Sequence, residues 1–504
     1  MNYYKLLIGG EEVNTGNCLY YIKAEDLIRR PFFIVAFITK FKTVARWLGF
    51  GRMFYAKCAM ASNKDVELAI DLAFRERKHI YNVDRGLKLK IINDFREELK
   101  RKQPSILQIL INEGHNKQLA EFELDYLFEK ILTNDNATLL LDALEQKSVY
   151  NKDYIIRQPY GVFGLITPYN GPLIAATIVL MSAILSGNAC IVKPPRDFPI
   201  STFELVKLLS QIIKNNKAPA GWVSIILGDS RKILDVWLES AKVHGIIFFG
   251  SSNHGLDIAA RGCQKGKKVI LELSGSDASL VWGDADLEQA TDDIVKSRFI
   301  ASGQFCIAIK RVFIHKKVYD KVVNLLLDKI KRLKIGLPSD PETTEIPIGR
   351  LEIIKKLKDV LRDAESRGAK VVAGGRFVDC NDKIKKRGFF LRPTIVTGVT
   401  NEMRLMKEEV FGPILPLVKI KSYQEAVSLI NESQYGLRAS IWAKDNKIID
   451  SFIDDINVGS IIVNDEHYYM GVNSPHLGGT KASGITGAKY FTEEMCYKKY
   501  IHRS

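Results

Sequence analysis

Residues 244–255 read HGIIFFGSSNHG, a short apolar run that ends in a turn of small residues. The run has the length of a buried strand, and the Gly250-Ser251-Ser252 turn leads into a segment that we expect to be helical. A strand, a turn and a helix in this order form the repeating unit of parallel sheets with crossover helices. One such unit is weak evidence for a parallel sheet. It indicates the fold only where the neighbouring sequence repeats the same order of strand, turn and helix.

On both sides of this stretch, short apolar runs alternate with segments of helical periodicity. Parallel strands joined by crossover helices place their ligands at the carboxyl ends of the strands. The polar and small residues that follow the apolar runs are therefore candidate ligand contacts. Strands are expected at 160–168, 189–193, 223–228 and 269–273, and helices at 174–185 and 201–214, the second with Ser201 or Thr202 as its N-cap.

A second α/β series follows from about residue 275 to residue 465, with strands expected at 310–314 and 414–420. A chain of 504 residues is too long for one hydrophobic core. We predict an α/β protein with a doubly wound, Rossmann-like cofactor domain, an α/β catalytic domain and a small β element. The predicted boundaries are 1–142 and 161–272 for the cofactor domain, 273–465 for the catalytic domain, and 143–160 with 466–504 for the β element and C-terminal segment.

The composition is that of an ordinary soluble globular protein, with 46% apolar and 26% charged residues. The formal net charge is +15, but acidic residues interrupt the basic ones, as in KIINDFREELKRK (90–102). This pattern favours solvated helix faces over a nucleic-acid interface, although it is compatible with a preference for anionic ligands. The seven cysteines show no CxxC and no Cys/His ligand spacing, so we expect no metal site, no disulfide framework and a cytoplasmic location.

One segment, RRPFFIVAFITKFKTVARWLGFGR (29–52), is both apolar and basic. Its longest uncharged run covers nine residues, from Pro31 to Thr39, whereas a membrane-spanning helix needs about 20. We therefore predict no integral membrane span. A buried strand followed by an amphipathic helix is the favoured interpretation, and docking on a membrane surface is the alternative.

The stretch SGQFCIAIKR (302–311) places a cysteine between a Gly-Gln turn and a short apolar run. Taken alone, Cys306 is best explained as a buried space-filler, because free cysteines are among the most buried residues. Seven further stretches change that interpretation. They are PYGVFGLITPYNGPL (159–173), GNACIVKPP (187–195), FFGSSNHG (248–255), LELSG (271–275), EEVFGP (408–413), YGLRASIWAKD (435–445) and LGGTKASG (477–484).

In this order, the stretches resemble the motifs of the aldehyde dehydrogenase superfamily over about residues 60–500. Glu272 and Cys306 lie thirty-four positions apart, as the family's pattern expects. The resemblance implies that Cys306 is the nucleophile, Glu272 the general base and Asn170 the amide that holds an oxyanion.

The resemblance also implies an aldehyde substrate, NAD or NADP as cofactor, and a homodimer or homotetramer. The strand-like DYIIRQ (153–158) and CYKKYIHR (496–503) suit a role in joining subunits, because unpaired strand edges invite pairing. The implied substrate-pocket residues are Tyr169, Phe305 and Leu477. The implied cofactor contacts are Ile166, Thr167, Pro168, Lys193, Arg196, Gly228, Gly250, Ser251, Gly255, Leu273, Glu409 and Phe411.

Several of these residues also have an ordinary structural explanation. Glu272 could form an ion pair at a strand end, and Asn170 could be the turn residue of Pro-Tyr-Asn-Gly. Lys193 could be a solvated strand end, and Gly250 with Ser251 could cap a helix. Capping and pyrophosphate binding are compatible, because both use the free N–H groups of a first helical turn.

The chemistry of aldehyde oxidation explains why these residue types suit the task. Hydride transfer needs a tetrahedral adduct, and a cysteine thiolate is a natural nucleophile to form it. Asn170 and the Cys306 backbone N–H would hold the oxyanion, and one such donor is worth about 3 kcal/mol. A water activated by Glu272 would then open the thioester. The sequence thus predicts an NAD(P)-dependent aldehyde dehydrogenase.

Two departures and one further resemblance refine this prediction. Arg196 stands three positions after Lys193, where NAD-preferring relatives carry an acidic residue, so we predict a preference for NADP over NAD. Ser274 stands where the family has a glycine. The stretch 464–500 resembles the branch that oxidises small polar aldehydes such as lactaldehyde and glyceraldehyde phosphate, which predicts a small polar or anionic substrate.

Two other functions stay open on the sequence. A CoA-acylating semialdehyde dehydrogenase must spare its thioester from water, and a hydrolytic base at Glu272 argues against it. A non-catalytic protein that retains the scaffold is the second alternative, and the presence of Asn170, Glu272 and Cys306 argues against it.

Overall fold

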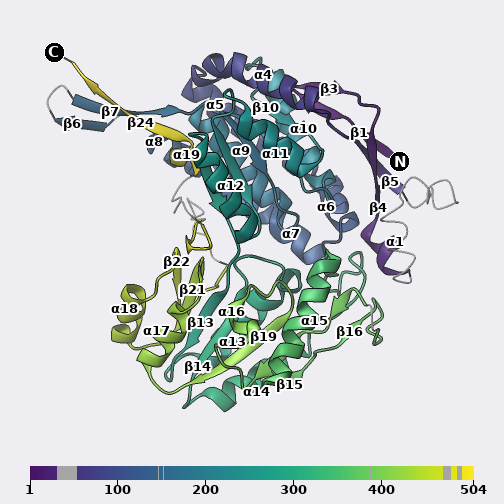
Figure 1. Cartoon of the computed structure of the whole chain (residues 1–504), viewed down its shortest axis with the longest axis vertical. Helices are drawn as coiled ribbons and strands as arrows, with labels where there is room; N and C mark the ends of the chain where they lie inside the picture. Colours follow the sequence, from purple (N-terminus) through teal and green to yellow (C-terminus); the bar gives the residue numbers. More distant parts are fainter. Residues whose placement is uncertain are drawn as a thin grey trace.

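The computed structural model contains two α/β bodies, each built on a seven-stranded sheet, and a small three-stranded sheet that projects from the first body (Figure 1). The predicted α/β fold, with a Rossmann-like part, a second α/β part and a small β element, is confirmed. The division of the chain into domains at the boundaries given above stays a prediction. The structure describes residues 1–30, 54–145, 147–150, 153–385, 388–468, 478–484 and 491–503.

The first sheet collects the apolar runs that alternate with helices between residues 160 and 273. Five adjacent strands, beginning at one edge, run parallel, and two short strands from the N-terminus extend the sheet in antiparallel fashion. The expected strands are therefore present, with their ends shifted by a few residues. In spatial order they are β12 (Lys268–Glu272), β11 (Gly245–Phe249), β8 (Val162–Ile166), β9 (Ala189–Lys193), β10 (Val223–Ile225), β2 (Leu6–Ile8) and β3 (Glu11–Val13).

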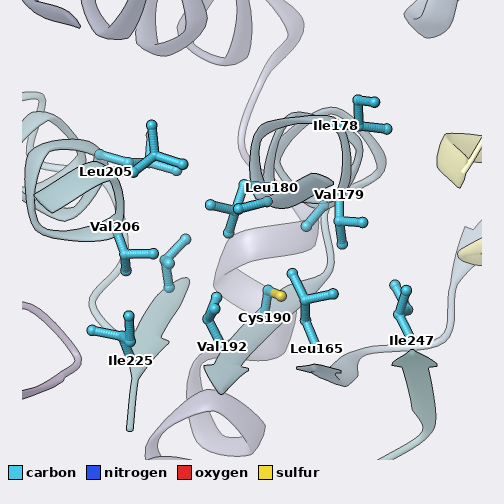
Figure 2. Packing of buried hydrophobic residues seen from close by; sticks show 14 of the residues in the cluster. Leu165, Ile178, Val179, Leu180, Cys190, Val192, Leu205, Val206, Ile225 and Ile247 are labelled. Atoms are coloured by element: carbon cyan, nitrogen blue, oxygen red, sulfur yellow. The ribbon is translucent and has the colours of Figure 1, made fainter. Parts of the chain in front are cut away.

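Two helices, α9 (Pro172–Ser186) and α10 (Ile200–Asn215), cover one face of this sheet. Figure 2 shows Val179 and Leu180 of α9 facing Leu165 of β8 and Cys190 of β9. Every residue of α9 is buried, which explains why its sequence is apolar on all sides. Cys190 is a space-filling cysteine of this core, and burial raises the pKa of its thiol to about 12.

The N-terminus of α10 corrects one expectation, because neither Ser201 nor Thr202 caps it. The N-cap position is Pro199, and the carboxylate of Glu113 accepts hydrogen bonds from the Ile200 N–H (2.6 Å) and the Ser201 N–H (3.2 Å). Glu113 follows α6 (Gln103–Asn112) and is buried. A carboxylate at this end of a helix also interacts favourably with the helix dipole, so a distant residue replaces the local cap.

The second sheet contains residues from 277 to 463, and six of its seven strands run parallel. The expected strands at 310–314 and 414–420 are β14 and β19 near its centre. In spatial order the strands are β15 (Lys370–Ala373), β18 (Thr394–Thr397), β19 (Ile414–Ile420), β14 (Ile309–His315), β13 (Asp277–Val281), β21 (Arg438–Trp442) and β22 (Ser460–Val463).

The projecting sheet has the order β24 (Cys496–His502), β7 (Asp153–Pro159) and β6 (Lys147–Tyr150), all antiparallel. β24 lies at an open edge, and its role in joining subunits stays a prediction.

A further small sheet is formed near the N-terminus by β1 (Asn2–Tyr4), β5 (Phe54–Ala59) and β4 (Cys18–Ile22). The strand and helix expected within 29–52 lie almost wholly outside the described residues. In the described ranges, no helix has the length and apolarity to cross a membrane.

The packing of β8 against α11 (Ser230–Glu239) predicts a sensitive position at Gly164. A Cβ on Gly164 would lie 2.3 Å from a ring carbon of Trp237, which is fully buried. We expect Gly164→Ala to lower the free energy of unfolding by about 1–3 kcal/mol, because the indole must move in a close-packed core. The midpoint of thermal unfolding measures this. The matched control is Gly16→Ala, where no atom lies within 4 Å of the new methyl group, and equal midpoints for the two variants would contradict the prediction.

Candidate active site

A cavity of about 1180 Å³ opens at the carboxyl ends of the first sheet's strands. The ends of β8, β9 and β12 contribute Ile166, Lys193 and Glu272 to its wall. The second body contributes residues such as Arg350 and Glu409 on the other side. This is the place that the strand topology predicts for a ligand.

The cavity gathers most of the residues that the sequence singles out. Gly228 and Gly255 are not on its wall, and Leu477 lies outside the described residues. Gly255 instead lets α12 (Ser252–Gln264) approach β12, since its Cβ would lie 2.2 Å from the Leu273 side chain. The residues on the wall are Ile166, Thr167, Pro168, Tyr169, Asn170, Lys193, Arg196, Gly250, Ser251, Glu272, Leu273, Phe305, Cys306, Glu409 and Phe411.

Cys306 follows a turn that is held in an unusual backbone conformation. Ala301 and Ser302 have φ values of 51°, and Gly303 has a φ of 69°. Left-handed conformations of residues other than glycine cost about 1–3 kcal/mol each and persist only where neighbouring contacts impose them. Here the Ser302 hydroxyl donates to the Ile346 carbonyl (2.9 Å) and accepts from the Ile346 N–H (2.8 Å).

Gln304 ties the same turn to the loop that carries Asn170. Its amide nitrogen donates to the carbonyls of Ala301 and Pro347, each at 3.1 Å. Its amide oxygen accepts from the Gly349 N–H (2.9 Å) and from the Tyr169 hydroxyl (3.3 Å). Sequence reasoning missed Gln304 as a positioning residue, although it lies two positions before Cys306 in the quoted stretch.

The electrostatic setting of Cys306 keeps its thiol protonated in the protein alone. Burial raises the pKa of the thiol to about 12, the charge of Lys310 lowers it, and the charges of Glu272 and Glu409 raise it. An exposed cysteine is partly ionised near neutral pH, and the buried position removes this advantage. Formation of a thiolate therefore requires a group that accepts the proton and a positive field.

Glu272 ends β12 with its side chain in the cavity wall and only 6% of its surface exposed. Burial raises the pKa of its carboxyl group to about 8. Among the described residues, its Oε1 has no hydrogen-bond partner and its carboxylate forms no salt bridge, so the ion-pair explanation finds no support there. A carboxyl group that ionises near pH 8 in a cavity is suited to act as a general base.

Two hydrogen-bond donors remain available beside the thiol. Asn170 lies on the loop after β8, and its side-chain amide has no hydrogen-bond partner in the described part of the chain. The backbone N–H of Cys306 likewise finds no acceptor among the described residues. Free donors on the wall of one cavity can stabilise a negative oxygen formed there.

The first turn of α12 is suited to bind a phosphate-bearing cofactor. The Ser251 hydroxyl does not cap this helix and pairs instead with His254 Nδ1 at 3.0 Å. The serine at position 274, where the family has a glycine, has a structural role here: its hydroxyl accepts a hydrogen bond from the Ser252 N–H at 3.3 Å. Gly250 packs closely against the Phe248 ring, since a Cβ there would lie 2.4 Å from it. The remaining N–H groups of the turn can receive a pyrophosphate.

Lys193 provides a buried cation on the cavity wall at the end of β9. Burial lowers the pKa of its ammonium group to about 8. In the described part of the chain, this ammonium group has neither a carboxylate nor a carbonyl partner. The neighbouring Thr167 hydroxyl is also buried without a partner. These unsatisfied groups fit the hydroxyl and phosphate groups of a dinucleotide, so the residues present fit NAD or NADP.

The comparison with known proteins agrees with this geometry. Residues 50–501 match the aldehyde dehydrogenase family. The chain belongs to that family. It is similar to a 3-sulfolactaldehyde dehydrogenase from Priestia aryabhattai, with 33% identity over 69% of this chain and 70% of that protein. It is also similar to a D-glyceraldehyde dehydrogenase (NADP(+)) from Picrophilus torridus, with 30% identity over 88% and 89% of the two chains.

Two further relatives are similar to this chain over most or all of its length. A lactaldehyde dehydrogenase from Methanococcus aeolicus is 27% identical over 87% of this chain and 92% of its own. The solved structure of a 3,6-anhydro-L-galactose dehydrogenase superposes with a TM-score of 0.86, at 25% identity and with 100% of both chains covered. The chain is thus an NAD(P)-binding oxidoreductase of the aldehyde dehydrogenase family.

The wall of this aldehyde dehydrogenase around Cys306 is aromatic. The ring of Tyr468 lies 5.9 Å from that of Phe305 and 6.4 Å from that of Phe122 (centroid distances). The Tyr468 hydroxyl donates to the Ser297 carbonyl at 2.8 Å, so it does not point freely at a substrate. Sequence reasoning missed Phe122, which comes from a segment far from any recognised motif. It also missed Tyr468, although this residue lies within the stretch 464–500 noted above.

Proposed function

We propose that this enzyme oxidises a small aldehyde to its carboxylate through a covalent adduct on Cys306, with NADP or NAD as the hydride acceptor. The carrying observation is that Cys306, Glu272, Asn170 and Lys193 meet on the wall of one cavity. An unpaired buried carboxyl group and a buried cation are each costly without a task.

The first step is attack of the Cys306 sulfur on the aldehyde carbon. The proton leaves Sγ for the Glu272 carboxylate or for water as the carbon–sulfur bond forms. The aldehyde oxygen becomes negative and accepts hydrogen bonds from the Asn170 amide and the Cys306 N–H. Each donor contributes about 3 kcal/mol to the stability of this transition state.

The second half of the reaction releases the acid from Cys306. A bound nicotinamide cofactor supplies the acceptor for the hydride that leaves the adduct, and an acyl thioester remains on the sulfur. Glu272 then removes a proton from a water molecule, which adds to the thioester carbon, and the thiol is released as the leaving group. Lys193, Arg196, the Gly250–Ser251 turn and Glu409 with Phe411 would hold the cofactor.

Replacement of the thiol tests this proposal directly. We expect Cys306→Ala to abolish NAD(P)H formation, measured by absorbance, with every aldehyde that the wild type oxidises, because no covalent adduct can form. The matched control is Cys263→Ala, which removes an exposed thiol and should leave turnover unchanged. Retained turnover in Cys306→Ala, or no turnover of any aldehyde by the wild type, would refute the proposed function.

The pKa of Glu272 predicts how hydrolysis depends on pH. A general base acts in its ionised form, so a carboxyl pKa of about 8 means that thioester hydrolysis accelerates as pH rises through 8 and then levels off. Single-turnover release of the carboxylate measures this rate.

The variant Glu272→Gln should slow release by about a hundredfold or more and lose the pH dependence. The control is Glu352→Gln, which changes an exposed carboxylate on the same cavity wall and should retain the wild-type profile. A wild-type rate that is flat across pH 8 would contradict this role. A thioester that CoA releases and water does not would support a CoA-acylating enzyme instead.

The preference for NADP rests on Arg196. Its side chain is exposed on the cavity wall just after β9, and the Tyr21 hydroxyl donates to its backbone carbonyl at 2.9 Å, which fixes the loop. A guanidinium there can pair with a 2′-phosphate. The relative from Picrophilus torridus is named for NADP(+), which supports the same choice.

We expect wild-type kcat/KM to be higher with NADP than with NAD, and Arg196→Glu to lower the NADP value by about tenfold or more, because a like charge replaces the ion pair. The control is Lys232→Glu, an equal change of charge at an exposed residue that is not on the cavity wall. A higher wild-type kcat/KM with NAD would overturn the preference.

The proposed substrate is a small polar aldehyde, hydroxylated or anionic. Three relatives are named for 3-sulfolactaldehyde, D-glyceraldehyde and lactaldehyde, which are small and carry a hydroxyl group beside the aldehyde. The described wall beside Cys306 offers aromatic rings and the Asn170 amide. The cations on the cavity wall are Lys193, Arg196, Arg231, Arg261, Arg350 and Lys356. Kinetics with these aldehydes and with succinate semialdehyde would rank the candidates.

A further inference from the structure

A lysine ammonium group is buried directly beneath the proposed nucleophile. Lys310 is the second residue of β14, and its side chain has no exposed surface. Its Nζ reaches back to donate hydrogen bonds to the Phe305 carbonyl (2.7 Å) and to the Cys306 carbonyl. The sequence shows an apolar run, IAIKR, and gives no sign that its lysine folds back onto the preceding turn.

Burial of this cation is expensive, and its surroundings compensate it only in part. Transfer of an ammonium group into the interior is strongly unfavourable unless partners replace water. The two carbonyl oxygens carry only partial negative charges, which compensate the ammonium charge in part. The carboxylate that acts most strongly on Lys310, Asp277 on the adjacent strand β13, already accepts from the Arg438 N–H (3.2 Å) and lies 3.2 Å from His467 Nε2. Among the described residues, Lys310 forms no direct salt bridge, so its positive field extends to its neighbours.

The thiol of Cys306 is one of those neighbours, and it faces several other charges. Lys310 is the strongest charge acting on the thiol, and it lowers the thiol pKa. Glu272, Glu409 and Asp277 act in the opposite direction. The buried residues Arg438 and Tyr468 also face the sulfur from β21 and the cavity wall.

We infer that Lys310 is a positioning residue that fixes the backbone of the nucleophile and supplies the positive field that makes a buried thiol ionisable. This inference rests on the proposed role of Cys306. Its chemistry is a simple ionisation: the S–H bond breaks, the proton goes to a base or to water, and the negative sulfur lies above a fixed cation. The residue does not touch the substrate or the cofactor.

The test measures the reactivity of Cys306 without requiring turnover. Purified enzyme is treated with iodoacetamide at several pH values, and the alkylation rate of the Cys306 peptide is followed by mass spectrometry. The variant Lys310→Gln keeps a hydrogen-bond donor and removes the charge. Loss of the charge raises the thiol pKa and lowers the thiolate fraction, and the higher nucleophilicity of a more basic thiolate offsets part of this. We expect alkylation to be about threefold slower at each pH below the thiol pKa.

A second variant separates charge from structural damage. Asp277→Asn removes a negative charge near the thiol, so it should accelerate alkylation, whereas disturbance of the fold would move both variants in the same direction. The Cys263 peptide, which is exposed, is the internal control and should react equally in all three proteins. Wild-type reactivity in Lys310→Gln, or equal shifts in both variants, would overturn the inference. Failure of the proposed function is a different result, namely NAD(P)H formation by Cys306→Ala.

Discussion

The hydrogen bonds that hold the turn from Ala301 to Gly303 are the constraint on which the site depends. Two residues other than glycine adopt left-handed backbone angles there, and nothing in their own side chains favours this conformation. Ser302 exchanges two hydrogen bonds with Ile346, and Gln304 makes four more with its surroundings. At about 1 kcal/mol each, such bonds offset the cost of the strained angles. The position of the Cys306 sulfur therefore depends on segment 346–349 as much as on β14, the strand that follows the turn.

Burial is the common cause of the unusual protonation behaviour at this cavity. It raises the pKa of Glu272 to about 8 and lowers the pKa of Lys193 to about 8, so an acid and a base converge on the same range from opposite sides. The same effect raises the pKa of Cys306 to about 12, which is the wrong direction for a nucleophile. A buried thiol therefore needs a compensating cation, and Lys310 is the one that the fold places beneath it.

The sequence predicted those parts of the molecule that depend on local order along the chain. Parallel strands that are buried on both faces read as continuous apolar runs, which is why β9, β11, β14 and β19 were found close to their true bounds. The motif residues were found because they lie directly after such runs. Contacts between distant segments could not be predicted: the carboxylate of Glu113 caps a helix that begins 87 positions later, and no local pattern reports this.

The same limit applies within the site. Phe122 comes from the helical region before the first motif, and its place beside Cys306 follows only from the packing of α7 (Lys117–Tyr126) against the first body. In the sequence, Lys310 looks like an ordinary strand residue. The residue pattern of β14 does not indicate that this side chain turns back to the loop before the strand. The assignment of Gly255 to the cofactor stays a prediction, and the motif did not indicate that its missing side chain also allows the contact between α12 and Leu273.

The segment 478–484 connects the neighbourhood of the base, Glu272, to the second body. The Leu273 N–H, next to Glu272, donates to the Ser483 carbonyl at 3.1 Å, and the Ser483 hydroxyl donates to the Ser274 carbonyl at 2.6 Å. The same hydroxyl accepts from the Gly436 N–H at 3.0 Å, which belongs to the second body. One serine thus joins the end of β12 to the strand region before β21. Because the chain crosses between the bodies at this point, a loose connection would let Glu272 drift from Cys306. The hydrogen bonds of Ser483 help to fix the base relative to the nucleophile, although Glu272 ends a strand of the first sheet and Cys306 precedes a strand of the second.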